Sequence, residues 1–277
     1  MDSFLDRMAA SSRRRAQAAR QQESIGSLAQ RAKGAPRPLP LKLRGFDLIA
    51  ELKLRSPAAG GLAGETFDPG QQLDAYVAGG AAAVSVLTEP DEFKGSLAHL
   101  QSAAARLRPA SCPVMRKDFL VDPYQVLEAR ANGASGVLLI VAMLADAELD
   151  ELFAAAREQE LFVLLEAFDS HDLDRLARMD LGTAGAPVLI GVNSRNLKTL
   201  AVDFERFSGL ADQIRDDVPA VAESGIDAVA DIEAVARLGY RLALVGSALM
   251  RNAEVTDTVA SFVAAGRRVA AEAAACS

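Results

Sequence analysis

The sequence has only two cysteines and two histidines among 277 residues, and it has no tryptophan. Cys112 and Cys276 are too few for a disulfide framework or a zinc cluster, so we expect both to be inert. His99 and His171 fall within expected helices, which predicts surface or packing roles. This placement disfavours histidine-dependent hydrolysis and a histidine-ligated metal site.

Long apolar runs are also missing. The longest stretches, such as Gly136 to Leu144, have about half the length that a membrane-spanning helix needs. The start of the chain shows no charged, apolar and cleavage regions of a signal peptide. Half of the residues are nevertheless apolar, and a chain of this size can bury roughly three quarters of the surface that its unfolded form exposes. We therefore expect a soluble, cytoplasmic protein with one large core and no membrane partner.

The charge is unevenly distributed along a chain of net charge −7. Residues 1–44 contain ten Lys or Arg against three Asp or Glu. A nucleic-acid-binding tail is one interpretation, but only Phe4 offers an aromatic ring beside the arginines, and the acidic remainder would repel phosphates. An apolar helical edge runs through the same segment, made by Phe4, Leu5, Met8 and Ala9. We expect residues 1–46 to form a helical extension that packs on the rest of the protein, with no nucleic-acid partner.

After a proline-rich segment at 36–40, short apolar runs alternate with amphipathic segments of roughly ten to fifteen residues, which indicates repeated βα units. The runs lack polar alternation, as do parallel strands that are buried on both faces. The expected strands are Asp47–Lys53, Ala83–Leu87, Val114–Lys117, Gly136–Val141, Phe162–Glu166, Val188–Asn193, Ala220–Glu223 and Leu242–Val245. Eight units predict an α/β fold, a (β/α)8 TIM barrel over residues 47–277. An open doubly wound sheet is the structural alternative, although no Gly-x-Gly-x-x-Gly follows the first strand.

Helix boundary signals lie between these strands. Asp68-Pro69 and Asp122-Pro123 predict helix starts, as do Asp146 and Ser170 with the acidic residues that follow them. Glycines that precede strands, at Gly79-Gly80, Gly133 and Gly239, predict left-handed C-caps. These signals form a weak internal repeat that agrees with a barrel.

Charged and amide side chains close several of the expected strands. They are Glu51 and Lys53 on the first strand, Lys117 on the third, Glu166 on the fifth, and Asn193 with Arg195 on the sixth. Taken singly, each is explained by a solvated strand end or an internal ion pair. In a barrel, however, these ends share one mouth, where a purely structural site would avoid the desolvation of several charges. The set therefore favours a functional centre.

The last two expected strands end in small residues. Glu223-Ser224-Gly225 and Gly246-Ser247 offer free amides, serine hydroxyls and close backbone approach, which suit phosphate oxygens. The loops after strands seven and eight are the usual phosphate site of a TIM barrel. We expect a phosphorylated substrate, although each Ser-Gly pair alone would more often be a turn.

The motifs that carry these residues resemble those of the indole-3-glycerol-phosphate synthase family over the whole barrel. The matching blocks are Glu51-Leu52-Lys53-Leu54-Arg55-Ser56-Pro57, Leu87-Thr88-Glu89, Arg116-Lys117-Asp118-Phe119, Leu164-Leu165-Glu166, Asn193-Ser194-Arg195-Asn196-Leu197, Glu223-Ser224-Gly225-Ile226 and Gly246-Ser247-Ala248-Leu249-Met250. One departure is Ala58-Ala59, where the family often has serine. It weakens any expectation of polar contacts from that loop.

The resemblance implies the conversion of 1-(2-carboxyphenylamino)-1-deoxyribulose 5-phosphate to indole-3-glycerol phosphate, with release of carbon dioxide and water. A ring carbon attacks the ribulose carbonyl, the carboxylate leaves, and a hydroxyl departs as water. This chemistry needs general acids but no cofactor and no metal. The implied partner is an anionic small molecule that carries phosphate and carboxylate groups, and complexes with other tryptophan-pathway enzymes are allowed.

The resemblance also implies roles for individual residues. Lys117 would protonate the carbonyl oxygen, and Lys53 would bind anionic groups and act as the acid in dehydration. Burial near another cation can lower the pKa of such lysines into a useful range. Glu51 and Glu166 would orient the lysines and relay protons, with the division between them left open. Asn193 and Arg195 would contact hydroxyl and carboxylate groups of the substrate. The implied contacts to substrate and phosphate are Ser56, Ser224, Gly225, Gly246 and Ser247. Those to the anthranilate ring are Phe93, Phe119, Leu138 and Leu197, although ordinary core packing explains the two leucines equally well.

Two alternatives to this function remain at the level of sequence. One is another phosphate-binding barrel of tryptophan biosynthesis, phosphoribosylanthranilate isomerase or the tryptophan synthase α subunit. Neither is expected to carry this order of strand-end residues. The other is a noncatalytic barrel whose outer helices bind a partner, against which the intact set of charged residues argues.

Overall fold

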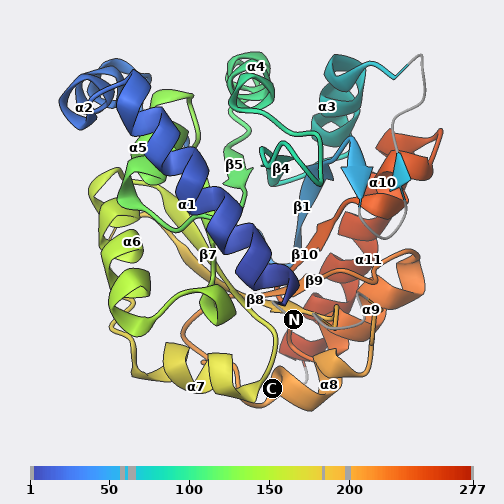
Figure 1. Ribbon diagram of the computed structural model, residues 1–277. Coiled ribbons are helices and arrows are strands. Elements are labelled where there is room, and N and C mark those ends of the chain that lie inside the picture. The colour runs from blue at the N-terminus through green and yellow to red at the C-terminus, as the bar shows by residue number, and fades with distance from the viewer. Residues whose placement is uncertain (1–2, 57–59, 62–66, 183–184, 197–200, 276–277) are drawn as a thin grey trace.

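The computed structural model describes residues 3–56, 60–61, 67–182, 185–196 and 201–275. Its parallel strands form a closed barrel in the order β1-β10-β9-β8-β7-β6-β5-β4, with helices around it (Figure 1). The barrel strands are β1 (Asp47–Leu52), β4 (Ala83–Leu87), β5 (Val114–Lys117), β6 (Gly136–Ile140), β7 (Phe162–Ala167), β8 (Val188–Asn193), β9 (Ala220–Glu223) and β10 (Leu242–Val245). Because β1 pairs with β10, the predicted (β/α)8 barrel is confirmed and the open sheet is excluded.

A short antiparallel pair, β2 (Arg55–Ser56) and β3 (Gly60–Gly61), follows β1 and was not expected from the sequence. The helices are α1 (Phe4–Gln22), α2 (Ile25–Gly34), α3 (Pro69–Ala78), α4 (Leu97–Leu107), α5 (Pro123–Ala131), the 3-10 turn η1 (Val141–Met143), α6 (Asp146–Glu158), α7 (Ser170–Arg178), α8 (Arg206–Ala211), α9 (Val229–Arg237), α10 (Ser247–Arg251) and α11 (Val255–Ala275). No helix in the described ranges combines the length and the apolar character that a membrane crossing requires.

The helix starts follow the capping signals, with two shifts of one residue. The carboxylates of Asp68 and Asp122 accept backbone N–H bonds at the starts of α3 and α5, as predicted. The residue before Ser170, Asp169, caps α7 instead. The N-cap of α6 is Ala145, one residue before the expected Asp146, and the Glu148 carboxylate accepts the backbone N–H of Ala145 at 2.9 Å.

The inward-facing residues of the strands change character along the barrel axis. Side chains alternate between the two faces of a strand, so every second residue points into the barrel. The inner layers hold the apolar cluster that includes Ile49, Ala83, Met115, Phe162, Leu164, Leu189, Val221 and Leu242. One step further toward the carboxyl ends, the inward positions become Glu51, Lys117, Glu166, Asn193 and Glu223. The barrel therefore has an apolar centre beneath a charged mouth.

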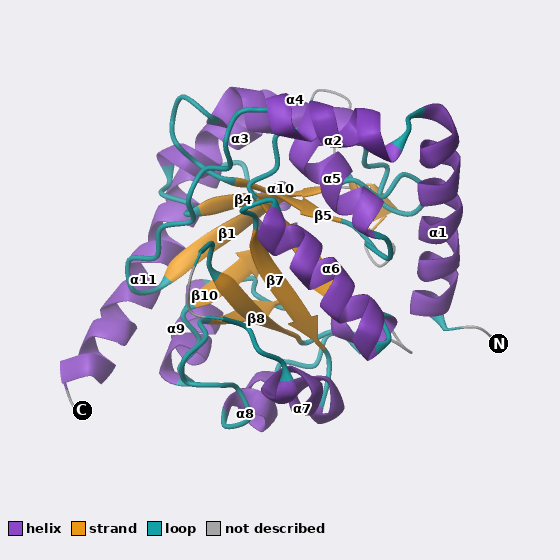
Figure 2. Ribbon diagram, turned by 90° about the vertical axis from the view of Figure 1, so that its left-hand side faces the viewer, coloured by secondary structure: helices purple, strands orange, loops and turns teal. Residues whose placement is uncertain are grey.

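The N-terminal helix α1 crosses this mouth. In Figure 1 it runs diagonally over the strands, and in Figure 2 it stands on the side toward which the arrowhead of β7 points. Its apolar edge is buried as expected, with Leu5, Met8 and Ala9 at most 7% exposed. Three of its arginines, Arg13, Arg15 and Arg20, pair with carboxylates of the barrel. The basic segment thus serves as a contact surface within the chain.

Candidate functional site

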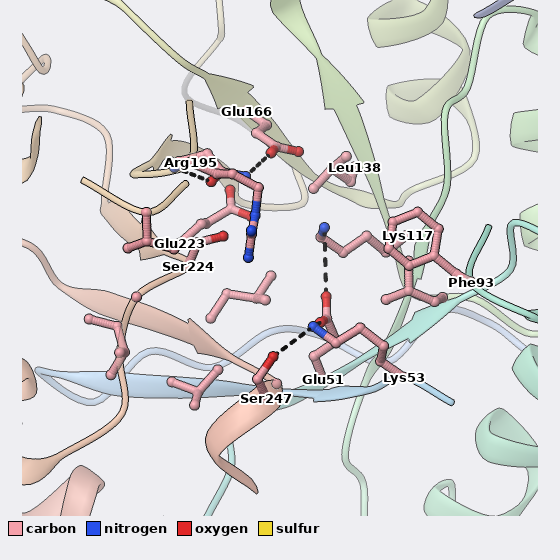
Figure 3. Close-up of a pocket in the computed structure, with 18 of the residues that line it drawn as sticks. Glu51, Lys53, Phe93, Lys117, Leu138, Glu166, Arg195, Glu223, Ser224 and Ser247 are labelled. Atoms are coloured by element: carbon pink, nitrogen blue, oxygen red, sulfur yellow. Dashed lines mark hydrogen bonds and ion pairs between the residues drawn. The ribbon is translucent and has the colours of Figure 1, made fainter. Parts of the chain in front are cut away.

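The carboxyl ends of the barrel strands surround a cavity of about 410 Å³ (Figure 3). All eight barrel strands contribute lining residues, and α1 adds two more at its start. The residues predicted for the site that line this cavity are Glu51, Lys53, Phe93, Lys117, Phe119, Leu138, Glu166, Asn193, Arg195, Ser224, Gly225, Gly246 and Ser247. Residues spread over most of the sequence therefore meet at one mouth. Neither histidine belongs to this lining, since His99 lies in α4 and His171 in α7.

Glu51 holds two lysines at the floor of the cavity. One of its carboxylate oxygens lies 2.9 Å from Lys53 Nζ, and the other lies 3.6 Å from Lys117 Nζ. A Cβ at position 246 would collide with Glu51, so Gly246 makes room for its side chain. Burial alone would raise the pKa of Glu51, but the charges and hydrogen bonds of both lysines lower it. Glu51 is therefore an ionised carboxylate that fixes where the two ammonium groups lie.

The pKa of Lys117 is raised, whereas the sequence predicted that it is lowered. Burial alone would lower the pKa of Lys117, but the carboxylates of Glu51, Glu166 and Glu223 outweigh that effect and raise it well above its usual range. The neighbours that decide the shift in the pKa are anions, whereas the predicted lowering depended on neighbouring cations. Lys117 is therefore a charged ammonium group at neutral pH, and Figure 3 shows its side chain pointing into the cavity.

Glu223 is a functional candidate that the sequence argument left out of the site. Its side chain is buried, and neither carboxylate oxygen has a hydrogen-bond partner among the described residues. Burial, Glu166 and Glu51 raise its pKa well above the ordinary range, against the opposing effect of Lys117. Gly191 makes room for it, because a Cβ there would collide with its carboxylate. The signal available in the sequence was its place as the last residue of an expected strand, like Asn193, with which it pairs in the structure.

Asn193 and Glu166 form a polar pair on the wall opposite Glu51. The Asn193 side-chain amide donates a short hydrogen bond to Glu166. The Asn193 side-chain oxygen accepts the backbone N–H of Arg195 at 2.9 Å, which orients the chain that leaves β8. Glu166 and Asn193 are 2% and 7% exposed. Buried polar groups that satisfy one another in this way keep a fixed geometry.

The loops after β9 and β10 offer small residues to the cavity. Ser224 has φ of 69° and Gly225 has φ of 74°. A left-handed residue other than glycine costs of order 1–3 kcal/mol, and such strain is characteristic of functional sites. Ser194 stabilises this turn by donating its hydroxyl to the carbonyl of Ser224 at 3.0 Å. On the other loop, Ser247 accepts a hydrogen bond of 3.2 Å from the ammonium group of Lys53.

Aromatic rings form another part of the lining. The Phe93 and Phe119 ring centroids lie 6.2 Å apart, and Leu138 also lines the cavity. Phe4 of α1 meets Phe119 edge to face at 5.9 Å, and Leu5 lies next to it in the lining. The sequence indicates a packing edge at Phe4 and Leu5, but their place in the cavity lining was not predicted, because no local pattern indicates what that edge covers.

The two remaining predicted site residues do not belong to the described lining. Ser56 pairs through its backbone with Gly60 in the β2–β3 hairpin. Leu197 lies outside the described residues. Sequence reasoning also missed an ion pair at the rim, in which Arg251 and Asp227 meet at 2.9 Å.

Comparison with known proteins agrees with the motifs. A sequence model of the family described as "Indole-3-glycerol phosphate synthase" matches residues 5–262. A protein of that name from a Nocardioides species is 46% identical over 223 residues, which cover 80% of this chain and 82% of the relative. One from an Arthrobacter species is 40% identical, covering 95% and 96% of the two chains. Among solved structures, 3-hexulose-6-phosphate synthase from Salmonella typhimurium is similar in fold, with a TM-score of 0.61, 14% identity, and coverage of 81% of this chain and 100% of that chain.

A closed barrel with lysines, carboxylates and small loop residues at the carboxyl ends of its strands defines a TIM-barrel enzyme. Within that class, the chain belongs to the indole-3-glycerol phosphate synthase family, which comprises carboxy-lyases of tryptophan biosynthesis that act on a phosphate-bearing small molecule. The family match separates it from the other phosphate-binding barrels of the pathway and from a noncatalytic barrel.

Proposed function

We propose that the cavity binds 1-(2-carboxyphenylamino)-1-deoxyribulose 5-phosphate and closes its indole ring, with Lys117 as the acid that protonates the carbonyl oxygen. The observation that carries this assignment is the ammonium group of Lys117, which is charged and lies among three carboxylates in the cavity. A proton donor in a partly desolvated site stabilises negative charge as it develops on an oxygen more effectively than water does. Neither a metal nor a cofactor enters this scheme.

The two ends of the substrate would meet opposite sides of the mouth. The phosphate would bind the loops of Ser224-Gly225 and Gly246-Ser247, with Lys53 supplying a positive charge, since its ammonium already contacts Ser247. The anthranilate ring would pack against Phe93, Phe119 and Leu138, with its carboxylate toward Arg195. Asn193 would hold a substrate hydroxyl. On the family resemblance alone, we also assign Ser56 to the substrate and phosphate contacts and Leu197 to the contacts of the anthranilate ring.

Proton transfer after ring closure would use the remaining carboxyl groups. Lys53 would serve as the acid when the hydroxyl leaves as water. Glu51 and Glu166 would orient the lysines and relay protons. Glu223, whose pKa is raised by burial and by its neighbouring carboxylates, keeps its proton over a wider pH range than an ordinary glutamate does. It is therefore a further proton carrier within the same cavity.

We also propose that residues 1–46 act as an extension and residues 47–277 as the catalytic barrel. The contacts of α1 with the barrel support this division. The hydroxyl of Tyr124 in α5 donates to the carbonyls of Ala19 and Glu23 at 3.1 and 2.9 Å, and the Gln125 side chain donates to Ser12 at 2.8 Å. The extension therefore remains docked on the end of the barrel that carries the site.

The substitution Lys117→Met tests the proposed acid. Methionine keeps much of the apolar stem and removes the charge and the transferable proton. We expect turnover to fall by about 10²–10⁴-fold, the range associated with a positioned acid, with folding retained. Product formation is followed by indole fluorescence, with circular dichroism and binding of a substrate analogue measured on the same samples.

Lys33→Met is the matched control, because Lys33 is exposed on α2 and far from the cavity lining. It should turn over at the parent rate. A folded Lys117→Met protein that forms indole-3-glycerol phosphate within a few-fold of the parent rate would remove Lys117 from the role of acid. A parent protein that forms no product from this substrate would overturn the proposed function itself.

A further inference from the structure

The carboxyl end of β5, which carries Lys117, is fixed by the buried carboxylate of Asp118. Asp118 follows Lys117 directly, and its side chain has no exposed surface. Thr88 donates its hydroxyl to this carboxylate at 2.7 Å, and Arg116 donates to it at 3.1 Å. The backbone N–H of Phe119 donates to it at 2.8 Å. Asp118 thereby fixes the backbone on the far side of Lys117 and also the start of the chain that carries Phe119 into the cavity.

A second arginine reaches the same carboxylate from the N-terminal helix. Both terminal nitrogens of Arg15 donate to Asp118, at 3.0 Å and 2.8 Å, one to each oxygen. A planar guanidinium that binds a carboxylate at two points fixes orientation as well as distance. Burial alone would raise the pKa of Asp118, but Arg116, Arg15 and the bond from Thr88 hold it well below its usual range. The carboxylate is therefore ionised whenever the protein is folded at ordinary pH.

A contact that only anchors α1 would not need this geometry. Arg13 already pairs with Glu148 on α6, and Arg20 pairs with Asp122, both with much more exposed side chains. Asp118 also has a buried partner in Arg116, which it shares with Glu128. In addition, Arg15 Nε is buried without a partner among the described residues. A buried donor that is left unmet costs free energy, so the two-point contact with Asp118 is kept at the expense of the Nε donor of Arg15.

We propose that Arg15 is a positioning residue for Lys117. Its two hydrogen bonds to Asp118 connect the N-terminal helix to the carboxyl end of β5, and they fix the direction in which the Lys117 side chain enters the cavity. This inference rests on the proposed role of Lys117 as the acid. The path is short, because Asp118 is the next residue and the carbonyl of Lys117 is itself held by the backbone N–H of Thr88 at 3.0 Å. Arg15 and Thr88 thus act on the same carboxylate from opposite elements.

The proposal predicts a coupling between Arg15 and Lys117 that a mere anchor would not show. A misplacement of about 1 Å at a reacting group can cost 10²-fold in rate, so we expect Arg15→Met to lower the single-turnover rate by roughly 10- to 100-fold. In a Lys117→Met background, where no ammonium remains to be positioned, the same change should alter the residual rate by less than about twofold. Arg15→Lys keeps the positive charge but loses the two-point hydrogen bonding, so it should lower the single-turnover rate less than Arg15→Met does. In the Lys117→Met background it should also leave the residual rate unchanged.

The experiment measures single-turnover indole fluorescence for Arg15→Met, Lys117→Met and the double variant, with Arg15→Lys as a second variant if Arg15→Met folds poorly. Arg13→Met and Arg20→Met are matched controls, because each breaks another ion pair between α1 and the barrel. Both should keep the parent rate. If Arg15→Met reduces the rate equally in the presence and absence of Lys117, or if the controls lose as much activity, then Arg15 only anchors the helix and the inference is wrong. If Lys117→Met itself is fully active, the proposed acid is wrong and the cycle shows it separately.

Discussion

Replacement of Glu223 by glutamine should stabilise the protein and weaken its activity. Glu223 is 1% exposed, its oxygens have no hydrogen-bond partner among the described residues, and two other carboxylates lie around it. Glutamine has nearly the same shape and no charge. It also offers an amide donor to the surrounding carboxylates. An unsatisfied buried polar group costs about 1–3 kcal/mol, and the glutamine amide relieves this cost by donating to those carboxylates. In a protein of this size, that gain corresponds to a rise in Tm of roughly 2–10 °C.

The gain should depend on pH in a defined direction. The pKa of Glu223 is raised in the folded protein, whereas in the unfolded chain it is near the ordinary value of 4.5. Below pH 4.5 the carboxyl group is protonated in both states, so its ionisation contributes nothing to the difference in stability between the parent and Glu223→Gln. As the pH rises above 4.5, the unfolded chain loses this proton first, and the parent loses stability that the variant retains. The difference in the free energy of unfolding should therefore be smaller at pH 5 than at pH 7 and pH 9.

Thermal denaturation of both proteins at these three pH values provides the measurement, with indole-3-glycerol phosphate formation followed on the same preparations. Glu158→Gln is the control, because Glu158 is exposed at the end of α6 and does not line the cavity. Turnover of Glu223→Gln should fall by about 10²-fold or more if Glu223 carries a proton. A variant that is less stable than the parent at pH 9, or a difference that stays constant with pH, would refute the reasoning about this buried carboxyl group.

Two further predictions concern the loops and the floor of the cavity. Ser224→Ala combined with Ser247→Ala should weaken binding of a phosphate-bearing substrate analogue, since each hydrogen bond to an anion is worth about 1.5–3 kcal/mol; unchanged affinity in a calorimetric titration would place the phosphate elsewhere. Gly191→Ala should displace Glu223 and lower turnover, because its Cβ would collide with that carboxylate. Gly209→Ala, which meets nothing within 4 Å on α8, should leave turnover unchanged, and equal activity of the two variants would show that the room beside Glu223 is unimportant.

The strands were predictable because their pattern depends on local composition. Parallel strands buried on both faces need continuous apolar runs, and those runs mark each strand to within about one residue at either end. Helix starts were less certain where two capping residues are adjacent, as at Asp169 and Ser170, because either side chain can accept the first N–H bonds. The sequence also predicted which residues surround one mouth, since strand ends in a barrel converge whatever the intervening helices contain.

The electrostatics of the site were not predictable in the same way. The pKa of Lys117 depends on distances to Glu51, Glu166 and Glu223, which come from different strands. Sequence order gives the identity of these neighbours but not their separations. The contact of Arg15 with Asp118 spans 103 residues, and no periodicity in the basic segment distinguishes Arg15 from Arg14 beside it. Such contacts become visible only when the helix is docked.

The closure of the barrel between β1 and β10 has a consequence for the nascent chain. Lys53 and Ser247, which meet across this seam, are 194 residues apart. At synthesis rates of about 5–20 residues per second, roughly 10–40 seconds pass between the emergence of one and the other. During that interval the free edge of β1 has no partner, and unpaired strand edges invite association with other chains. This edge of the first strand therefore waits longer for its partner than any other strand edge of the barrel, long before the site that it helps to build exists.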